Sequence, residues 1–302
     1  MHTTEITSEI LNNSVIAVPP LARNPDLTVN ADENRKIVDH IEKGGISTLL
    51  YGGNANFYHL RPSEFEPLIG TLADIAGEDT LVIPSAGPAY GTQMDQAKIL
   101  AQSKFPTAMV LPAEGIMTDA GLLTGFRHFV EAISRPAVLY IKREGYITPR
   151  GAAQLVNDDL VSFIKYAIVR EDTAQDEFLD ELVQQVDPSK IVSGIGEQPA
   201  VTHLTQFNLT GFTAGCVCVR PDLSQELLGV IKAGKLDRAA DIQAIFKPLE
   251  DLRNGINPIR VLHAAVQLAD IAETGPQMPL LCGLNDEESA QVKEAAKNLL
   301  SA

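Results

Sequence analysis

The sequence has no tryptophan, and aromatic residues account for only 5% of its 302 positions. A large buried core must therefore consist mainly of Ala, Val, Ile and Leu, which suits a parallel sheet wrapped by helices. No apolar run approaches the ~20 residues that cross a bilayer. Residues 1–10 contain no basic segment followed by an apolar stretch. We therefore expect neither a membrane span nor a secretory signal.

Cysteine and basic residues are also scarce. Three cysteines without a disulfide-dense region are typical of a reducing compartment, so we expect a cytoplasmic protein. Lys and Arg total 24 against 39 Asp and Glu, which gives a formal net charge of −15. This balance excludes the basic surface that a nucleic acid or an anionic membrane requires. We therefore expect neither of these as a partner.

Eight short apolar runs recur along the chain, and each ends near a turn or a polar cluster. Runs of this length, rich in β-branched residues, are typical of strands that are buried on both faces. They are Ser14–Val18, Ile46–Tyr51, Leu81–Ser85, Thr107–Leu111, Ala137–Ile141, Val161–Lys165, Lys190–Ser193 and Gly211–Val219.

Segments with a helical spacing of apolar residues follow these runs. The second of them opens with proline, which is favoured at the first position of a helix. The segments are Asp32–Lys43, Pro62–Ile75, Thr92–Ser103, Gly121–Ile133, Thr148–Val156, Asp172–Val186, a weaker Glu197–Phe207, and Ser224–Ala233.

This alternation predicts an α/β fold, a (β/α)8 TIM barrel. The first and last strands start 197 residues apart, about 28 for each of seven units. A strand with its crossover helix needs roughly 30. After the eighth unit only helical patterns remain, at Asp237–Leu252, Pro258–Thr274 and Asp286–Leu300. We predict a barrel over residues 1–234 and a three-helix C-terminal extension over residues 235–302, packed on the barrel.

The active site of such a barrel lies at the C-terminal ends of its strands, where Lys165 and Tyr140 stand out. Desolvation at the end of an apolar strand lowers the pKa of a lysine, and a neutral amine can attack a carbonyl carbon. Tyr140 ends the preceding strand, only ~4.8 Å away, where a phenol can shuttle protons. The alternatives are a lysine that reaches solvent and a core tyrosine bonded to the backbone.

Gly52, Gly53 and Asn54 follow the second strand. Paired glycines let successive N–H groups point into one concavity that can hold a carboxylate, although the same residues also form ordinary turns. Arg143 and Arg220 can bind a substrate carboxylate or lie on the rim. Three further acids in loops at the barrel mouth are more typical of solvated side chains than of catalysts: Glu114, Glu144 and Glu197.

No pattern in the sequence predicts a metal or a cofactor. Cys216 and Cys218 are expected on one face of the last strand. With no histidine nearby and with Cys282 far along the chain, they make a poor zinc site and are more typical of small buried hydrophobic residues. Neither a Walker-type loop nor a GxGxxG loop occurs.

Together these landmarks resemble the dihydrodipicolinate synthase/N-acetylneuraminate lyase family of Schiff-base-forming class I aldolases. The resemblance runs from about residue 15 to residue 300. It rests on the glycine-rich loop at 52–60, Leu139-Tyr140, Phe163-Ile164-Lys165, and Asn257-Pro258 before a long helix. It implies a homotetramer in which Lys165 forms an imine with pyruvate or another 2-oxo acid. It further implies that Tyr140 relays protons and that the loop at Gly53-Asn54 holds the carboxylate.

Departures from the family pattern concern the substrate end of the site. The family loop commonly reads GTTGE, whereas here it reads Gly-Gly-Asn-Ala-Asn from residue 52. Both threonines are missing, so the hydroxyl that usually joins the tyrosine's relay must come from elsewhere or be absent. Aligned from Tyr140, Gly145 takes the place of the family's acceptor-binding arginine. Ala113-Glu114 replace its paired tyrosines.

We therefore predict a lyase or aldolase that acts on pyruvate or another 2-oxo acid through Lys165 and Tyr140. Gly52, Gly53, Asn54 and Arg143 are the predicted substrate-binding residues. Three alternatives stay open: a dehydratase or hydratase of a 2-oxo sugar acid, a true dihydrodipicolinate synthase, and a barrel that binds a small acid without catalysis. The departures argue against the second of these.

Overall fold

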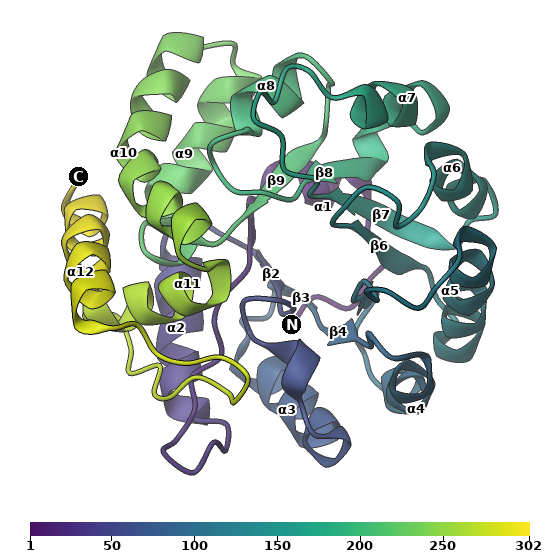
Figure 1. Cartoon of the computed structure of the whole chain (residues 1–302), viewed down its shortest axis with the longest axis horizontal. Coiled ribbons are helices and arrows are strands. Elements are labelled where there is room, and N and C mark those ends of the chain that lie inside the picture. Colours follow the sequence, from purple (N-terminus) through teal and green to yellow (C-terminus); the bar gives the residue numbers. More distant parts are fainter.

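The structure, a computed structural model, describes all residues from Met1 to Ala302. Nine short parallel strands form one sheet in the order β3-β2-β1-β9-β8-β7-β6-β5-β4. Its two end strands, β3 and β4, follow each other in the chain, so the sheet returns on itself as a barrel (Figure 1). The predicted TIM barrel is thereby confirmed. The strands are β1 Ile16–Ala17, β2 Thr48–Leu50, β3 Leu81–Ile83, β4 Ser85–Ala86, β5 Met109–Val110, β6 Ala137–Ile141, β7 Val161–Tyr166, β8 Ile191–Ser193 and β9 Gly211–Ala214.

The third predicted strand is divided in two by Pro84. β3 pairs with β2 before this residue, and β4 pairs with β5 after it. Proline has no N–H to donate to a ladder, but the Pro84 carbonyl still accepts from Met109 N at 2.8 Å. The single predicted strand Leu81–Ser85 thus pairs with β2 through its first half and with β5 through its second half.

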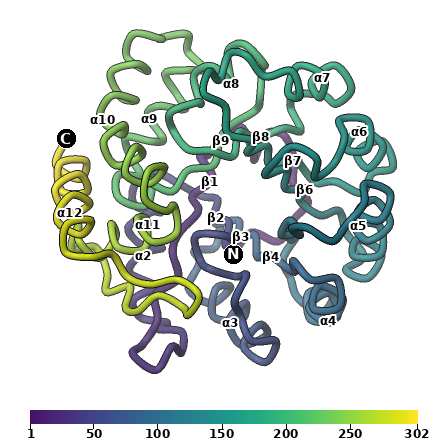
Figure 2. Tube along the Cα trace, in the orientation of Figure 1, coloured from purple at the N-terminus to yellow at the C-terminus, as the bar shows by residue number.

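Helices surround the barrel, and Figure 2 shows the trace passing round it in chain order. The helix predicted at Asp172–Val186 begins only at Glu177, because the Asp176 side chain accepts from Leu179 N and caps it there. The helix predicted at Glu197–Phe207 is also shorter and spans Ala200–Thr205. A short first helix was not predicted. The helices are α1 Ser8–Asn13, α2 Ala31–Lys43, α3 Pro62–Ile75, α4 Tyr90–Ala101, α5 Asp119–Ile133, α6 Pro149–Asn157, α7 Glu177–Gln185, α8 Ala200–Thr205, α9 Pro221–Lys232, α10 Leu236–Gly255, α11 Pro258–Leu268 and α12 Asp286–Ser301.

The predicted last strand, Gly211–Val219, is too long. β9 ends at Ala214, and a 3-10 helix, Cys216–Cys218, takes over. The turn between them passes closely under α11, because a side chain at Gly215 would collide with Leu262. Cys216 and Cys218 are buried, as expected, but they do not share one face of a strand.

The three C-terminal helices lie outside the barrel, where α10 packs against α9, and α11 and α12 pack against α10 (Figure 1). The division at residue 234 stays a prediction. One continuous cluster of 85 buried hydrophobic residues forms the core. None of the helices has the length and apolar character needed to cross a membrane.

Candidate active site

Lys165 and Tyr140 meet at the mouth of the barrel. They are partners in the register of β7 and β6. The Lys165 Nζ atom lies 4.4 Å from the centroid of the Tyr140 ring. Both residues are buried, with exposed fractions of 5% and 9%. The two strand-end residues predicted to act together are thus adjacent.

Burial is the main influence on the Lys165 amine. It lowers the pKa of Lys165 to about 7, and the charges of Arg253 and Lys142 lower it further. No carboxylate forms an ion pair with Lys165. Near neutral pH a large fraction of this amine is uncharged, which is the form that attacks a carbonyl carbon.

Three buried or half-buried tyrosines lie near one another at the mouth. Burial raises the pKa of Tyr140 to about 12, while the charge of Arg253 opposes this shift. Burial also raises the pKa of Tyr58 and Tyr146, and the charges of Tyr140 and Tyr146 add to the shift of Tyr58. All three phenols therefore keep their protons at neutral pH. Tyr58, in the loop after β2, is a hydroxyl that the motif analysis missed.

The loop after β2 is compact. The Asn54 side chain donates to Val18 O at 2.9 Å, and Phe57 N donates to Gly52 O. A side chain at Gly52 would collide with Met109 and crowd Ser85. The N–H groups of Gly53 and Asn54 donate to no protein acceptor. Two adjacent free donors of this kind can hold a carboxylate.

The loop after β6 carries the predicted Arg143 and a second cation, Lys142. Lys142 is exposed, and its Nζ lies 5.6 Å from the centroid of the Tyr58 ring. The Arg143 side chain bonds to Glu144 O at 3.2 Å. Glu144 pairs with Arg170, and Glu114 is exposed, as expected for rim acids. Arg220 bonds to Asp222 and to carbonyls at the end of α12.

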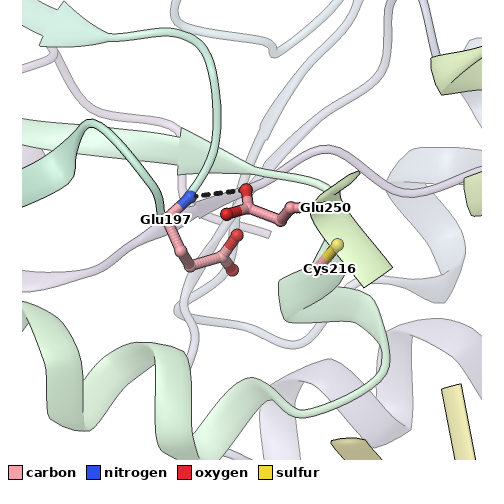
Figure 3. Close-up of side chains that lie close together, drawn as sticks. All are labelled: Glu197, Cys216 and Glu250. Carbon is pink, nitrogen blue, oxygen red and sulfur yellow. Dashed lines mark hydrogen bonds between the residues drawn. The ribbon is translucent and has the colours of Figure 1, made fainter. Parts of the chain in front are cut away.

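Glu197, by contrast, is completely buried, so the expectation of a solvated loop acid is wrong. Its carboxyl group faces that of Glu250 on α10, with Cys216 close by (Figure 3). Glu197 N donates to Glu250 Oε1 at 2.9 Å, and Ser224 Oγ donates to Glu197 Oε1 at 3.0 Å. The other oxygen of each carboxyl group has no partner. Helix α10 supplies the second acid, which no pattern near Glu197 could reveal.

One proton shared between the two carboxyl groups accounts for this arrangement. Burial and the charge of Glu250 raise the pKa of Glu197 well above its usual range. Burial also raises the pKa of Glu250, but Arg253 opposes the shift. Like charges in such close contact cannot both persist. We therefore interpret Glu197 as the protonated partner and Glu250 as the carboxylate.

The same group of side chains has the donor types of a metal site. The ligand atoms of Glu197, Cys216 and Glu250 all lie within 4.8 Å of one another. Arg253 is close enough to lower the pKa of the Cys216 thiol, although burial raises that pKa overall. A fixed guanidinium disfavours a second cation at short range. The donors therefore suit a shared proton better than a divalent ion.

Arg253 joins this pair to the loop after β8. Its Nη2 donates to Ile195 O at 2.6 Å. A side chain at Gly196 would collide with Glu250 and lie 3.0 Å from Arg253 Nη1. A side chain at Gly194 would lie 3.0 Å from Lys165 Cγ. Lys165 and Arg253 therefore contact the same short loop, Lys165 at Gly194 and Arg253 at Ile195 and Gly196.

A large open hollow of about 1140 Å³ lies beside the mouth, between α4 and α5. Tyr90, Ile116 and His128 line it on the outside, and Tyr146 lines it on the inside. It does not include Lys165 or Tyr140. The hollow is therefore separate from the pair formed by Lys165 and Tyr140.

Comparison with known proteins gives two kinds of relative. The chain is 24% identical to a 4-hydroxy-tetrahydrodipicolinate synthase of Chlorobaculum parvum, over 97% of this chain and 99% of that protein. It is 27% identical over 146 residues to a probable 5-dehydro-4-deoxyglucarate dehydratase of Streptomyces avermitilis. That match spans only 46% of the dehydratase and 47% of this chain.

Solved structures share the fold. A crystal structure of dihydrodipicolinate synthase from Bacillus clausii has a TM-score of 0.85 at 21% identity, covering 96% of this chain and 98% of its own. A structure described as PhdJ bound to a substrate intermediate has a TM-score of 0.84 at 19% identity, covering 99% and 98%. No model of a protein family matches the sequence.

Proposed function

We propose that the chain, which is similar over nearly its whole length to 4-hydroxy-tetrahydrodipicolinate synthases, belongs to the dihydrodipicolinate synthase/N-acetylneuraminate lyase family and is a lyase or aldolase that forms a Schiff base between Lys165 and a 2-oxo acid. One observation carries the proposal. Lys165 is buried at a strand end with a pKa of about 7, without a carboxylate partner and against the Tyr140 ring. A purely binding barrel has no need of an uncharged amine at this place.

The first chemical step forms a carbon–nitrogen bond. The neutral Lys165 amine attacks the 2-oxo carbon, and the carbinolamine then loses its hydroxyl group as water to give the imine. Tyr140, whose phenol is protonated at neutral pH, donates a proton to the departing oxygen and takes one back later. The imine then withdraws electrons from the neighbouring carbon, where a bond breaks or forms.

The loop after β2 holds the carboxylate of the 2-oxo acid in this proposal. The free N–H groups of Gly53 and Asn54 point to that role, and Gly52 allows the close approach of the loop to β5. Arg143 remains a proposed contact on the rim. Tyr58 is our candidate for the hydroxyl that the missing family threonines would have supplied.

Borohydride trapping tests the central proposal. The protein is incubated with pyruvate, reduced and digested, and the adduct is located by mass spectrometry. We expect the pyruvate-derived mass on the peptide that contains Lys165 and no adduct on the Lys165→Met variant. An adduct confined to other lysines, or none with any 2-oxo acid, would overturn the proposal.

Among the possible reactions, dehydration or cleavage of a 2-oxo sugar acid is favoured over dihydrodipicolinate synthesis. Gly145 occupies the position of the acceptor-binding arginine, and Ala113-Glu114 replace the paired tyrosines. The loss of one charged hydrogen-bond partner costs about 1.5–3 kcal/mol. A coupled assay with pyruvate and aspartate semialdehyde, run beside a panel of 2-oxo sugar acids, distinguishes the reactions. Catalytic efficiency with the semialdehyde above ~10⁴ M⁻¹s⁻¹ would contradict this choice.

We also propose a cytoplasmic homotetramer. The exposed Ile116 and Tyr90 beside the hollow between α4 and α5 support an association surface there. The free thiols of all three cysteines are compatible with a reducing compartment. Light scattering at micromolar concentration is expected to give four times the chain mass, and a stable monomer would overturn the assembly.

A further inference from the structure

We propose that Arg253 of α10 forms an anion subsite beside Lys165 and binds the second carboxylate of a 2-oxo diacid. The inference rests on the proposed imine function, because it concerns the far end of the same substrate. It assigns to the C-terminal extension a role in substrate selection.

The first step of the argument is position. Ile195 O accepts from Arg253 Nη2 at 2.6 Å, and Gly194, one residue earlier, lies against the Lys165 side chain. The charge of Arg253 influences Lys165 and Tyr140 alike. The guanidinium therefore lies at the barrel mouth, although its helix is outside the barrel.

The second step is hydrogen-bonding capacity. Arg253 Nη2 and Nε donate only to neutral oxygens, those of Ile195 and of the Asn254 side chain. Its Nη1 has no partner in the protein. It is not sealed from solvent as the unpartnered Arg23 Nη2 and Arg170 Nε are. Two N–H donors of a nearly buried cation are thus free, and a carboxylate is the group that fits them.

The third step is the support of this geometry. Glu250 lies one turn before Arg253 on α10, and its carboxylate is fixed by Glu197 N. Gly196 has a φ of +110°, and a side chain there would collide with Glu250 and lie 3.0 Å from Arg253 Nη1. The bonds of Arg253 to Ile195 O and to the Asn254 side chain, together with this close packing, hold the guanidinium in place and make it an ordered binding group.

The other cations at the mouth are less suited to this task. Arg143 bonds to the backbone of its own loop, and Lys142 is exposed above the Tyr58 ring. A sugar diacid also agrees with one relative, since a glucarate carries a carboxylate at each end.

The experiment compares a monoacid with a diacid in the same proteins. Half-saturating concentrations for borohydride trapping are measured for pyruvate and 2-oxoglutarate. The dissociation constants of both are measured by calorimetry without reductant. The variants are Arg253→Met, Arg253→Lys, Lys142→Met and the control Arg238→Met, which removes an exposed arginine of the same helix that pairs with Glu226.

We expect Arg253→Met to weaken 2-oxoglutarate binding by about 10- to 100-fold and pyruvate binding by less than about threefold. Arg253→Lys is expected to lie between wild type and Arg253→Met, and Arg238→Met to match wild type. The ratio of the two affinities cancels any loss of folded protein or change in the reactivity of Lys165.

Three results would overturn the subsite: an equal loss for both acids, no loss for either, or a diacid-specific loss in Lys142→Met alone. Failure of the imine proposal is recognised separately, because wild type would then give no adduct at Lys165. In that case the calorimetric ratio still decides whether Arg253 binds the second carboxylate.

Discussion

Lys165 and Tyr140 stand opposite each other in neighbouring strands, with the amine 4.4 Å from the centroid of the phenol ring. The ring therefore replaces water on one side of Lys165 without supplying a negative charge. The electron-rich face of the Tyr140 ring stabilises the charged form of Lys165 to some extent. Burial nevertheless favours the neutral amine. The contact provides both a desolvated nucleophile and a nearby proton donor.

Replacing Tyr140 by Phe tests the proton-transfer half of this contact. The ring stays, so trapping of pyruvate on Lys165 should persist, whereas steady-state turnover should fall by roughly 10²- to 10⁴-fold. Turnover and trapping are measured on the same preparation. Full activity in Tyr140→Phe would leave the tyrosine only a packing role.

The pKa of Lys165 predicts a stability change with a definite pH dependence. The folded pKa is about 7 against 10.5 for a free lysine, so between these values the unfolded chain binds more protons and burial of Lys165 destabilises the fold. Lys165→Met should remove imine formation and raise the free energy of unfolding by roughly 2–5 kcal/mol near pH 7.

That gain should shrink toward zero as the pH rises from 7 to 10.5, which urea unfolding at several pH values measures. If the difference in the free energy of unfolding between Lys165→Met and wild type did not change with pH, the pKa of Lys165 would not be lowered by folding. Lys98, an exposed lysine paired with Asp95, offers a matched control, since Lys98→Met removes no buried amine.

Glu197→Gln tests the shared proton. A neutral amide mimics the protonated acid, and a raised folded pKa means that wild-type stability falls as the pH rises above 4.5. The free energy of unfolding of the variant, relative to wild type, should therefore improve between pH 5 and pH 8. If the free energy of unfolding of wild type instead rose relative to that of the variant between pH 5 and pH 8, Glu197 would be the ionised partner.

Gly196→Ala tests the packing between the loop after β8 and α10. A φ of +110° is strained for alanine, and its Cβ would collide with the Glu250 carboxylate. We expect a loss of about 2–4 kcal/mol in the free energy of unfolding. Gly229→Ala, in the exposed part of α9 with open space around it, should instead be neutral or slightly stabilising. Equal effects of the two substitutions would contradict this packing.

Sequence patterns located the parts of the site that end strands. Lys165 and Tyr140 terminate apolar runs, and in a parallel barrel such ends must converge, so local spacing was sufficient. Glu250 and Arg253 lie on a helix outside the barrel, where a charged residue is ordinarily solvated. They are buried only because α10 packs against the loop at Gly196. The spacing of apolar residues within α10 does not show what the helix packs against.

The boundaries of the strands likewise depend partly on local sequence and partly on tertiary packing. Uniform apolar runs located every barrel position, but they could not show where pairing stops. Pro84 interrupts one ladder because it has no N–H. β9 ends at Ala214, next to the point where Gly215 packs against Leu262 of α11. The first cause is visible in the sequence and was overlooked, whereas the second depends on a helix far along the chain.

The division at Pro84 also affects how the barrel is closed. The ladder of backbone pairs is a strip with two ends, β3 and β4, which Pro84 joins in the chain, and Ser85 Oγ on β4 also donates to Tyr51 O, directly after β2, at 2.7 Å. A circular permutant with its termini at Pro84 would therefore have two free sheet edges, each open to pairing with another chain. Termini placed in any other loop would leave this seam intact. The connection at Pro84 is therefore part of what closes the sheet into a ring.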